Sequence, residues 1–490
     1  MDSIHTDDKV SGGLKWSAIS VIAVRVVAGL RGLTIARIVG PQAVGEFAAI
    51  IAFTAAASLV AEMGLQSYLV HLGPRAEADA GAVWQLSFLT GLVATSALLA
   101  CSGLIAELYG DSALKPLAWV LSVSVVFAAV SAVPNALLRV QFRFAAVARA
   151  QTVAEVAGSV VGVTAALNGA RVWSLVAAAL TNQAVLLVVL LASRPRWHRR
   201  ALRRPEVRME ALRYGGVLTA GAAIWIVALQ GDNVTVGRTL GPAALGLYAF
   251  AYNYGIMPGA LVGSAVTDVS LASFSLAGSD SERAERFVQL VRLGVAIAAP
   301  LVAISLPLAA PAIRVLLGER WVNAAAPLRA MLLVGFFRGV VPTESLLRSK
   351  GNVAIELKVG LIAAPATLAA AYFSSRLGIA SVAVFVGFVL TAAALVETQI
   401  AIRGVHLRGF TVVRAALPNA LLGVALAVSL GVIERMHVVS DATLVFVLGP
   451  IALIAYGASL RWWRPKDWHD LLEIVRSRRA AAAPSQADTT

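Results

Sequence analysis

The stretch ARIVGPQAVGEFA, from Ala36 to Ala48, recurs as GRTLGPAALGLYA, from Gly237 to Ala249, at an offset of 201 residues. The arginine, the Gly-Pro pair, the following glycine and an aromatic residue coincide in the two copies. Such a match between distant parts of one chain indicates an internal repeat, and a repeat constrains the fold more than any single element does.

Two further matches follow in the same order. VPNALLRVQFRF, from Val133, matches VPTESLLRSKGN, from Val341, at an offset near 208. LNGARVWSLVAAAL, from Leu167, matches RLGIASVAVFVGFV, from Arg376, at an offset near 209. Three collinear matches at nearly one offset predict a duplicated architecture.

The composition is that of a membrane protein. Of the 490 residues, 59% are hydrophobic and only 14% are charged, and the mean hydropathy is +0.79, whereas a soluble domain carries about a quarter of charged residues. Apolar segments recur that are long enough to cross a hydrocarbon core, which takes about 20 residues. We predict an all-α, polytopic protein with about fourteen transmembrane helices, at residues 14–37, 45–70, 82–106, 116–138, 147–167, 172–193, 215–237, 244–270, 288–312, 323–346, 353–374, 378–402, 411–433 and 440–460.

Basic residues predict the topology. An even number of spans places both termini on one side, and with that side in the cytoplasm the inner connectors are 139–149, 194–213, 348–350, 403–414 and the tail after residue 461. These connectors carry about three times as many Lys and Arg as the outer ones, as the positive-inside rule requires. We expect the first helix to be retained, because its apolar run contains arginines and has no signal-peptide cleavage site. The net charge of +14 therefore predicts contact with membrane lipids and not with nucleic acid.

The repeat divides the chain into parts. We predict an N-terminal six-helix lobe at 1–193, a basic cytoplasmic linker at 194–213, a C-terminal six-helix lobe at 214–402, transmembrane helices 13 and 14 at 403–460, and a cytoplasmic tail with a disordered end at 461–490. An even number of spans precedes the second copy, so both copies run in the same sense. Parallel repeats of this kind occur in transporters whose substrate site lies between the halves. The linker is interpreted as a topology anchor that touches anionic headgroups, or as a regulatory docking segment.

Three arginines lie at membrane depth, where ionisable residues mark functional sites. Arg25 and Arg31 lie in segment 14–37, and Arg338 lies in segment 323–346. Each either lines a wet cavity or forms a structural ion pair, and Arg31 is near enough to the outer end to snorkel. Because the guanidinium fork suits phosphate and carboxylate, these arginines are candidates for binding an anionic substrate.

Carboxylates form the second set of candidates. Asp232, followed by Asn233, is the repeat counterpart of Arg31, and Glu344 lies toward the inner end of its segment. We expect Asp232 to form a salt bridge with Arg31 or Arg25, or to act as a titrating or cation-binding coupling group. Asn233 and Glu344 share this assignment to coupling or ion pairing. Other carboxylates, among them Glu62, Asp268, Glu155, Glu356 and Glu397, lie nearer to span ends and are not singled out.

Small residues and prolines mark where helices pack and bend. Gly158 and Gly162, and again Gly259 and Gly263, have the small-xxx-small spacing that allows close helix packing. Pro134 and Pro342 occupy equivalent places in the two copies and are predicted to kink both alike, either as architecture or as a moving hinge.

Several kinds of chemistry are not supported by the sequence. It contains no GxxxxGK[ST] phosphate loop and no HExxH zinc pair. Its one cysteine, Cys101, permits no disulfide framework and no cysteine-based metal site. We therefore predict that the protein is not an enzyme and has neither a metal nor a cofactor, and that an ion gradient is a candidate energy source.

With these motifs in order, the chain resembles the polysaccharide transporters, the Wzx-type oligosaccharide flippases of the multidrug/oligosaccharidyl-lipid/polysaccharide flippase superfamily. The resemblance covers roughly residues 12–410. It rests on the order and spacing of ARIVGPQAVGEFA, AEMGLQSYLV, LYGDSAL, VPNALLRVQFRF, GARVWSLV, GDNVTVGRTLGPAALGLYAFAYNYGIMP, LLGERWVNAAAPL and LLRSKGN. Glu62 stands where many relatives have Asp, a departure that keeps the carboxylate.

The resemblance implies two six-helix lobes around a central cavity lined by helices 1 and 7, in a bacterial inner-membrane protein. The implied substrate is a polyprenyl-diphosphate-linked oligosaccharide, moved by alternating access for exopolysaccharide, capsule or lipopolysaccharide synthesis, with proton or sodium coupling. A polysaccharide polymerase and export machinery are candidate partners, and we expect a monomer. The alternatives are a multidrug or peptidoglycan-precursor exporter of the same superfamily, a membrane polymerase or ligase, and a scaffold that does not transport.

Overall fold

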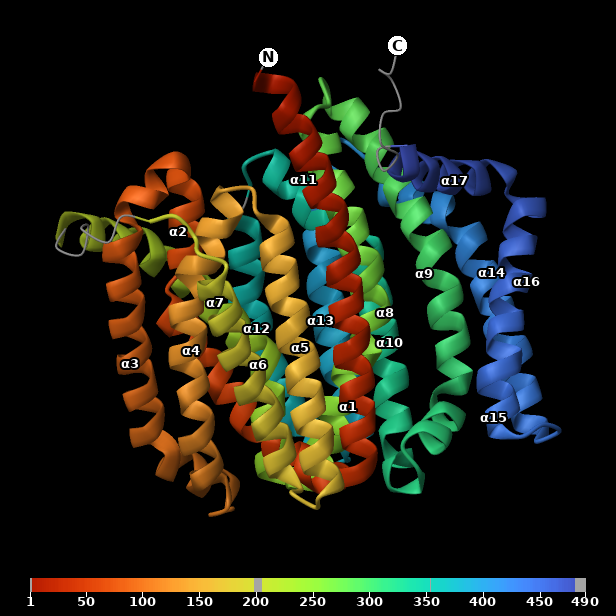
Figure 1. Cartoon of the computed structure of the whole chain (residues 1–490). Helices are drawn as coiled ribbons and strands as arrows, with labels where there is room; N and C mark the ends of the chain where they lie inside the picture. Colours follow the sequence, from red (N-terminus) through yellow and green to blue (C-terminus); the bar gives the residue numbers. More distant parts are fainter. Residues whose placement is uncertain (1, 198–204, 353, 481–490) are drawn as a thin grey trace, which may run out of the picture. The chain divides into compact units, whose positions relative to one another are not determined.

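The chain folds into helices throughout the part that the computed structural model describes, which is residues 2–197, 205–352 and 354–480 (Figure 1). The side chains of residues 2–23 and of Arg25 are outside this description. The helices are α1 (Asp2–Glu62), α2 (Leu65–Leu72), η1 (Gly73–Arg75), α3 (Ala76–Tyr109), α4 (Leu114–Val140), α5 (Phe144–Leu167), α6 (Val172–Ala192), α7 (Pro205–Leu240), α8 (Pro242–Ser275), α9 (Asp280–Leu316), η3 (Glu319–Ala324), α10 (Ala325–Val340), α11 (Thr343–Ser349), α12 (Ala354–Ser375), α13 (Ile379–Arg403), α14 (Gly409–Met436), α15 (Asp441–Thr443), η4 (Leu444–Leu448), α16 (Gly449–Trp463) and α17 (Pro465–Ala480).

The predicted spans all lie on helices. Eleven helical stretches of the described residues are long and apolar enough to cross a membrane, and the first of them, Val26–Tyr109, contains three predicted segments or parts of them. The remaining ten stretches contain one predicted segment each, and the segment 215–237 lies on α7. The prediction of an all-α, multi-pass membrane protein is confirmed.

The repeated Gly-Pro pair makes the same backbone turn in both copies. Gly40 interrupts α1 with φ 81° and ψ 174°, and Pro41 begins the helical stretch that follows. Gly241 has φ 86° and separates α7 from α8, which begins at Pro242. A positive φ favours glycine, and proline is well suited to the first turn of a helix. The quoted stretch therefore joins two long helices by a sharp turn in each copy.

The chain forms two compact units. The first is built on Met1–Gln230 with Gly241–Leu245, and the second on Gly231–Leu240 with Gly246–Arg478. In the first unit, α5 packs on α6 and α1, and α3 packs on α4. In the second unit, α10 packs on α9 and α13, and α12 packs on α13. The boundary therefore lies near the turn between α7 and α8, C-terminal to the predicted linker.

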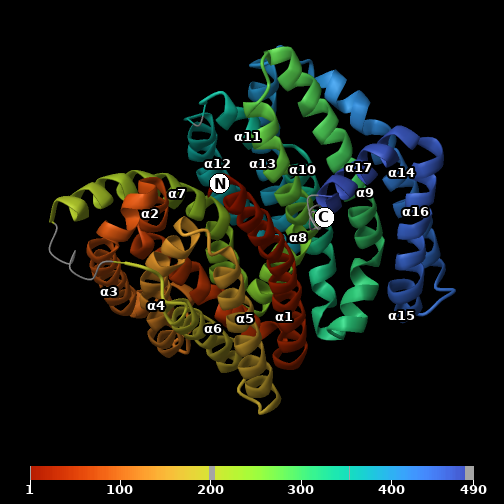
Figure 2. The same ribbon diagram turned by 45° about the horizontal axis from the view of Figure 1, so that its top comes forward.

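The last helices of the chain are attached to α9. Both α14 and α16 contact α9, and α17 runs from the end of α16 toward α9 (Figures 1 and 2). Asp467 on α17 is fully buried, pairs with Arg292 of α9 at 3.1 Å, and accepts a hydrogen bond from Asn419 of α14 at 3.0 Å. The predicted tail at 461–490 thus contains a helix that ion pairs hold in place, while residues 481–490 lie outside the described part.

The two equivalent prolines do not act alike, and the prediction of matching kinks is wrong. Pro134 lies inside α4, which continues to Val140. In the second copy the helix ends at Val340, Val341 is extended with φ −110° and ψ 113°, and Pro342 precedes α11. The physical reason lies in the sequence. The two prolines match at an offset of 208 residues, but the arginines after them, at 139 and 348, match at 209. The second copy therefore holds one extra residue between the proline and the arginine, so the helical register cannot match on both sides, and Val341 takes the extended conformation that is favoured before proline.

Candidate functional site

A buried carboxylate lies between three helices of the first unit. Glu155 on α5 has a side chain only 8% exposed, and its Oε1 lies 2.9 Å from Nη1 of Arg31 on α1. Its Oε2 accepts a hydrogen bond from Nδ2 of Asn182 on α6, at 2.8 Å. Three helices thus contribute to one polar cluster, in which the charged carboxylate has both an ionic and a neutral partner.

Glycine makes this cluster sterically feasible. A Cβ atom on Gly158 would lie 2.8 Å from the carbonyl oxygen of Ala178 and 3.4 Å from Nη1 of Arg31. One on Gly162 would lie 2.7 Å from the Cβ of Ala178. The small-xxx-small spacing therefore brings α5 close to α6 and leaves room for the guanidinium, which confirms the packing role predicted for these two glycines.

Sequence reasoning did not single out Glu155. Arg31 was expected to line a cavity or to pair with Asp232, whereas the ion pair in the structure joins Arg31 to Glu155. A signal was present, because Glu155, Gly158 and Gly162 are spaced by three and four residues and so share one face of a helix. The face that carries the close-packing glycines is the one that meets other helices.

A second buried carboxylate lies in the second unit. Asp232 on α7 is 1% exposed. Its Oδ2 accepts a hydrogen bond from Oη of Tyr248 on α8 at 2.7 Å, and its Oδ1 accepts one from the backbone N–H of Asn233 at 2.8 Å. Tyr248 is the aromatic residue of the repeated stretch, so the motif that marks the duplication also supplies a partner for this carboxylate.

Three more polar or charged side chains of the second unit are linked electrostatically to Asp232. The Tyr252 hydroxyl on α8 interacts electrostatically with Asp232 and with Arg338, which is half-buried in the last turn of α10. Arg338 interacts in turn with Glu397 on α13, a carboxylate that is 9% exposed. Asp232, Tyr252, Arg338 and Glu397 thus form one electrostatic network from four helices of the second unit. Sequence reasoning found Asp232 and Arg338 but left Glu397 among the residues near span ends.

The other predicted site residues have different surroundings. Glu344, in the first turn of α11, is exposed and pairs with Arg348 at 3.1 Å. Arg348 also pairs with Glu356 of α12 at 3.3 Å. Asn233 is buried beside Asp232. Arg25 lies on α1, but its side chain, like that of Asp268 on α8, is outside the described residues.

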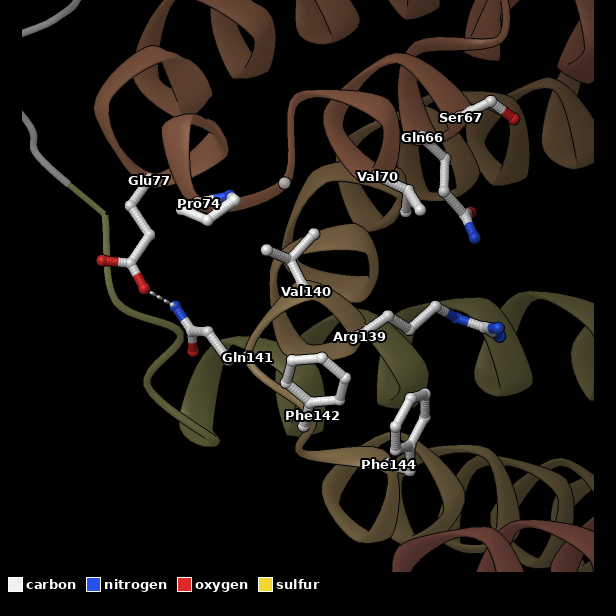
Figure 3. A pocket seen from close by; sticks show the side chains of 11 residues that line it. Gln66, Ser67, Val70, Pro74, Glu77, Arg139, Val140, Gln141, Phe142 and Phe144 are labelled. Carbon is white, nitrogen blue, oxygen red and sulfur yellow. Dashed lines mark hydrogen bonds between the residues drawn. The ribbon is translucent and has the colours of Figure 1, made fainter. Parts of the chain in front are cut away.

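A pocket of about 880 Å³ opens in the first unit, at the end where α2 and η1 meet the turn between α4 and α5 (Figure 3). Its lining combines amide, hydroxyl, carboxylate, guanidinium and aromatic groups. Gln141 donates a hydrogen bond to Glu77 at 2.9 Å, and the rings of Phe142 and Phe144 lie edge to face with centroids 6.2 Å apart. Phe142 is 62% exposed and has a positive φ of 54°. A mixture of planar hydrogen-bonding groups and exposed rings is suited to a polar ligand that also has apolar faces.

Comparison with known proteins agrees with this architecture. A protein-family model described as "Polysaccharide biosynthesis protein" matches residues 34–326. The chain is 24% identical over 363 residues to the lipopolysaccharide biosynthesis protein WzxC of Escherichia coli (strain K12), covering 72% of each chain. It is also 24% identical over 491 residues to the succinoglycan biosynthesis transport protein ExoT of Rhizobium meliloti (strain 1021), covering 98% of each.

A solved structure supports the fold. The lipid II flippase MurJ, in an inward closed conformation, superposes with a TM-score of 0.69 at 13% identity, covering 91% of this chain and 98% of that one. At such identity the likeness concerns the fold alone. Since the family model matches more than half of the residues, the resemblance drawn from the sequence motifs is confirmed, and the chain belongs to this family of polysaccharide biosynthesis proteins.

Proposed function

We propose that this protein translocates a polyprenyl-diphosphate-linked oligosaccharide across the bacterial inner membrane by alternating access, for the synthesis of an exopolysaccharide, capsule or lipopolysaccharide. The observation that carries the proposal is the alignment with the succinoglycan transport protein, which runs over 98% of both chains. Because this relative aligns over nearly its whole length, it supports a transport function for the whole chain.

The buried charges favour an anionic lipid-linked substrate. Arg31 keeps 24% of its side chain exposed although it pairs with Glu155, and Arg338 is only half-buried. Arginine at membrane depth is costly and binds phosphate through two parallel hydrogen bonds. We assign Arg25, Arg31 and Arg338 to the diphosphate, and the pocket with Gln66, Glu77, Gln141, Phe142 and Phe144 to an early contact with sugar.

Asp232 is assigned to coupling. Its carboxylate oxygens accept hydrogen bonds from the Tyr248 hydroxyl and from the backbone N–H of Asn233, and both of these donors are neutral. A carboxylate in such a setting can accept a proton or a sodium ion. Arg338 and Glu397 lie in the same network and would transmit a change in that charge. We propose that the break at Pro342, which follows Arg338 at the end of α10, is the hinge.

Complementation of a strain that lacks its own oligosaccharide flippase tests the transport function. The wild-type chain is expected to restore surface polysaccharide, whereas Arg338→Ala and Arg25→Ala are expected to insert into the membrane and to restore less than about a tenth of it, since loss of a charged hydrogen bond costs about 1.5–3 kcal/mol. Lipid-linked oligosaccharide should accumulate in the inner leaflet.

Arg376→Ala is the matched control, because Arg376 is an exposed arginine in the connector after α12. It should restore polymer to the wild-type level. Full polymer output from both Arg25→Ala and Arg338→Ala would remove these residues from the substrate site. Vesicles containing the purified protein separate the alternatives: translocation of lipid II or of a cationic drug, without that of the diphosphate-linked oligosaccharide, would refute the proposed substrate.

A further inference from the structure

A second pocket of the first unit is lined by arginines. It has a volume of about 740 Å³ and lies where α5 begins and α6 ends. Half of its lining residues are arginines and none is acidic: Arg143, Arg149, Val153, Val189, Ala192, Ser193, Arg194 and Arg196. Four like charges around one cavity repel one another, so the arrangement favours binding of an anion.

No carboxylate neutralises these arginines in the described part of the chain. Arg143 donates to the backbone carbonyl of Arg194 at 3.2 Å, and Arg149 donates to that of Ala145 at 3.4 Å. The ion pairs between described side chains include none of the four. Among the described residues, the positive charge of the pocket is therefore not compensated by an ion pair.

Most of the remaining lining of the pocket is apolar. Val153 and Val189 come from α5 and α6, and these helices expose further apolar side chains beside it: Val153, Val156, Val160, Val188 and Leu191 are between 39% and 63% exposed. Exposed apolar faces on membrane-spanning helices contact lipid chains. The pocket thus combines basic groups with aliphatic ones, and the helices that supply the aliphatic groups expose a surface suited to hydrocarbon.

The chemistry of the lining distinguishes between ligands. The neighbouring pocket of Figure 3 has a single arginine, Arg139, together with amides, a carboxylate and aromatic rings, which are groups that bind sugar hydroxyls and ring faces. The arginine pocket offers guanidinium groups, one hydroxyl and aliphatic carbons. The planar fork of a guanidinium group matches the spacing of phosphate oxygens. Clusters of basic residues at a membrane surface attract anionic lipids, at about 1 kcal/mol per residue.

We propose that this pocket binds the phosphate headgroup of an anionic phospholipid whose acyl chains lie along α5 and α6. The site is separate from the buried clusters assigned to transport. Its placement in the cytoplasmic leaflet rests on the proposed topology, but the binding itself does not. Such a lipid would neutralise the arginines and hold together the ends of α5 and α6, so it should stabilise the folded protein.

Thermal unfolding of the purified full-length protein in neutral detergent tests the site. Phosphatidylglycerol is expected to raise the Tm, and phosphatidylcholine is not. The double variant Arg149→Gln/Arg196→Gln should weaken the apparent affinity for phosphatidylglycerol about thirtyfold, at roughly 1 kcal/mol for each residue. It leaves in place the hydrogen bond from Arg143 to Arg194. Arg171→Gln/Arg376→Gln, which changes two exposed arginines of other connectors, should bind as the wild type does.

The conservative variant Arg149→Lys/Arg196→Lys keeps the charge and should keep most of the binding, which separates loss of a ligand from loss of the fold. Native mass spectrometry should detect phosphatidylglycerol retained by the wild type and by the control. Equal stabilisation by phosphatidylcholine, or by inorganic phosphate alone, would overturn the assignment to an anionic phospholipid. Retention of polyprenyl diphosphate in preference to phosphatidylglycerol would also overturn it and would give the pocket to the transported substrate.

Discussion

Glu155 and Arg31 form an ion pair that depends on both partners. The side chain of Glu155 is 8% exposed and that of Arg31 is 24% exposed. Removal of one partner from a buried pair leaves a charge without compensation and costs about 3–5 kcal/mol of stability. We expect the lower end of this range, because the Arg31 side chain is partly exposed. Glu155→Ala should therefore lower the Tm of the purified protein clearly, whereas Glu107→Ala, which changes an exposed carboxylate of α3, should not.

Glu155→Gln refines this test. The amide keeps the shape of the side chain and can still accept the hydrogen bond from Asn182, but it carries no charge. We expect a smaller loss of Tm than in Glu155→Ala, together with a loss of surface polysaccharide in the complementation assay. If Glu155→Ala unfolds at the same temperature as Glu107→Ala, the pair contributes nothing to stability and Arg31 is free to serve the substrate alone.

At the scale of residues, the sequence revealed the charges but not their partners. Arg31, Asp232 and Arg338 were found because a charge inside an apolar run is conspicuous against its neighbours. Glu155 and Tyr248 were not found, because they meet Arg31 and Asp232 only through the packing of different helices. A hydropathy pattern records depth along the membrane normal but does not record which helix faces which.

Helix α8 crosses α10 at unusually close range, and glycine permits it. A Cβ on Gly339 would lie 2.1 Å from the carbonyl oxygen of Gly259, and one on Gly335 would lie 2.8 Å from the Cα of Ile256. These contacts are with backbone, which cannot move aside as a flexible side chain can. Gly339→Ala should therefore force the two helices apart and destabilise the protein by about 1–3 kcal/mol or more, as overpacking does.

The control for this crossing is Gly103→Ala. No atom lies within 4 Å of the position that a Cβ on Gly103 would take, and α3 is helical there. Alanine should be neutral or stabilising by up to about 1 kcal/mol, because it has the higher helix propensity. The Tm of each variant, measured in the same detergent, gives the comparison. Equal Tm values for the two variants would show that the crossing tolerates a methyl group.

At the scale of elements, long helices were predictable and short ones were not. A long apolar run that crosses lipid must be helical, because a helix pairs the backbone N–H and C=O groups within the run itself. The short helices α2 and α11 and the polar helix α17 depend on tertiary contacts, such as the burial of Asp467 against α9 and α14. The break before α11 was also missed. Only the one-residue difference between the copies indicates it, and the matching prolines suggest instead that the two helices are alike.

At the scale of the whole molecule, the duplication predicts that equivalent connectors lie on the same side of the membrane. Asn168 and Leu377, at an offset of 209 residues, are exposed beyond the ends of α5 and α12. Ala145 and Ala354, at the same offset, are exposed in the first turns of α5 and α12. A parallel repeat places Asn168 with Leu377 outside and Ala145 with Ala354 inside, because an even number of spans separates the members of each pair.

Cysteine labelling can test this directly, since the chain has the single cysteine Cys101. In a Cys101→Ala background that still supports polysaccharide export, Asn168→Cys and Leu377→Cys should react with a membrane-impermeant maleimide in spheroplasts. Ala145→Cys and Ala354→Cys should react only after the membrane is opened. An inverted repeat would place the members of each pair on opposite sides, so labelling of one member without the other would reject the parallel duplication. Reversal of both pairs together would keep the duplication and would instead reject the cytoplasmic placement of the termini.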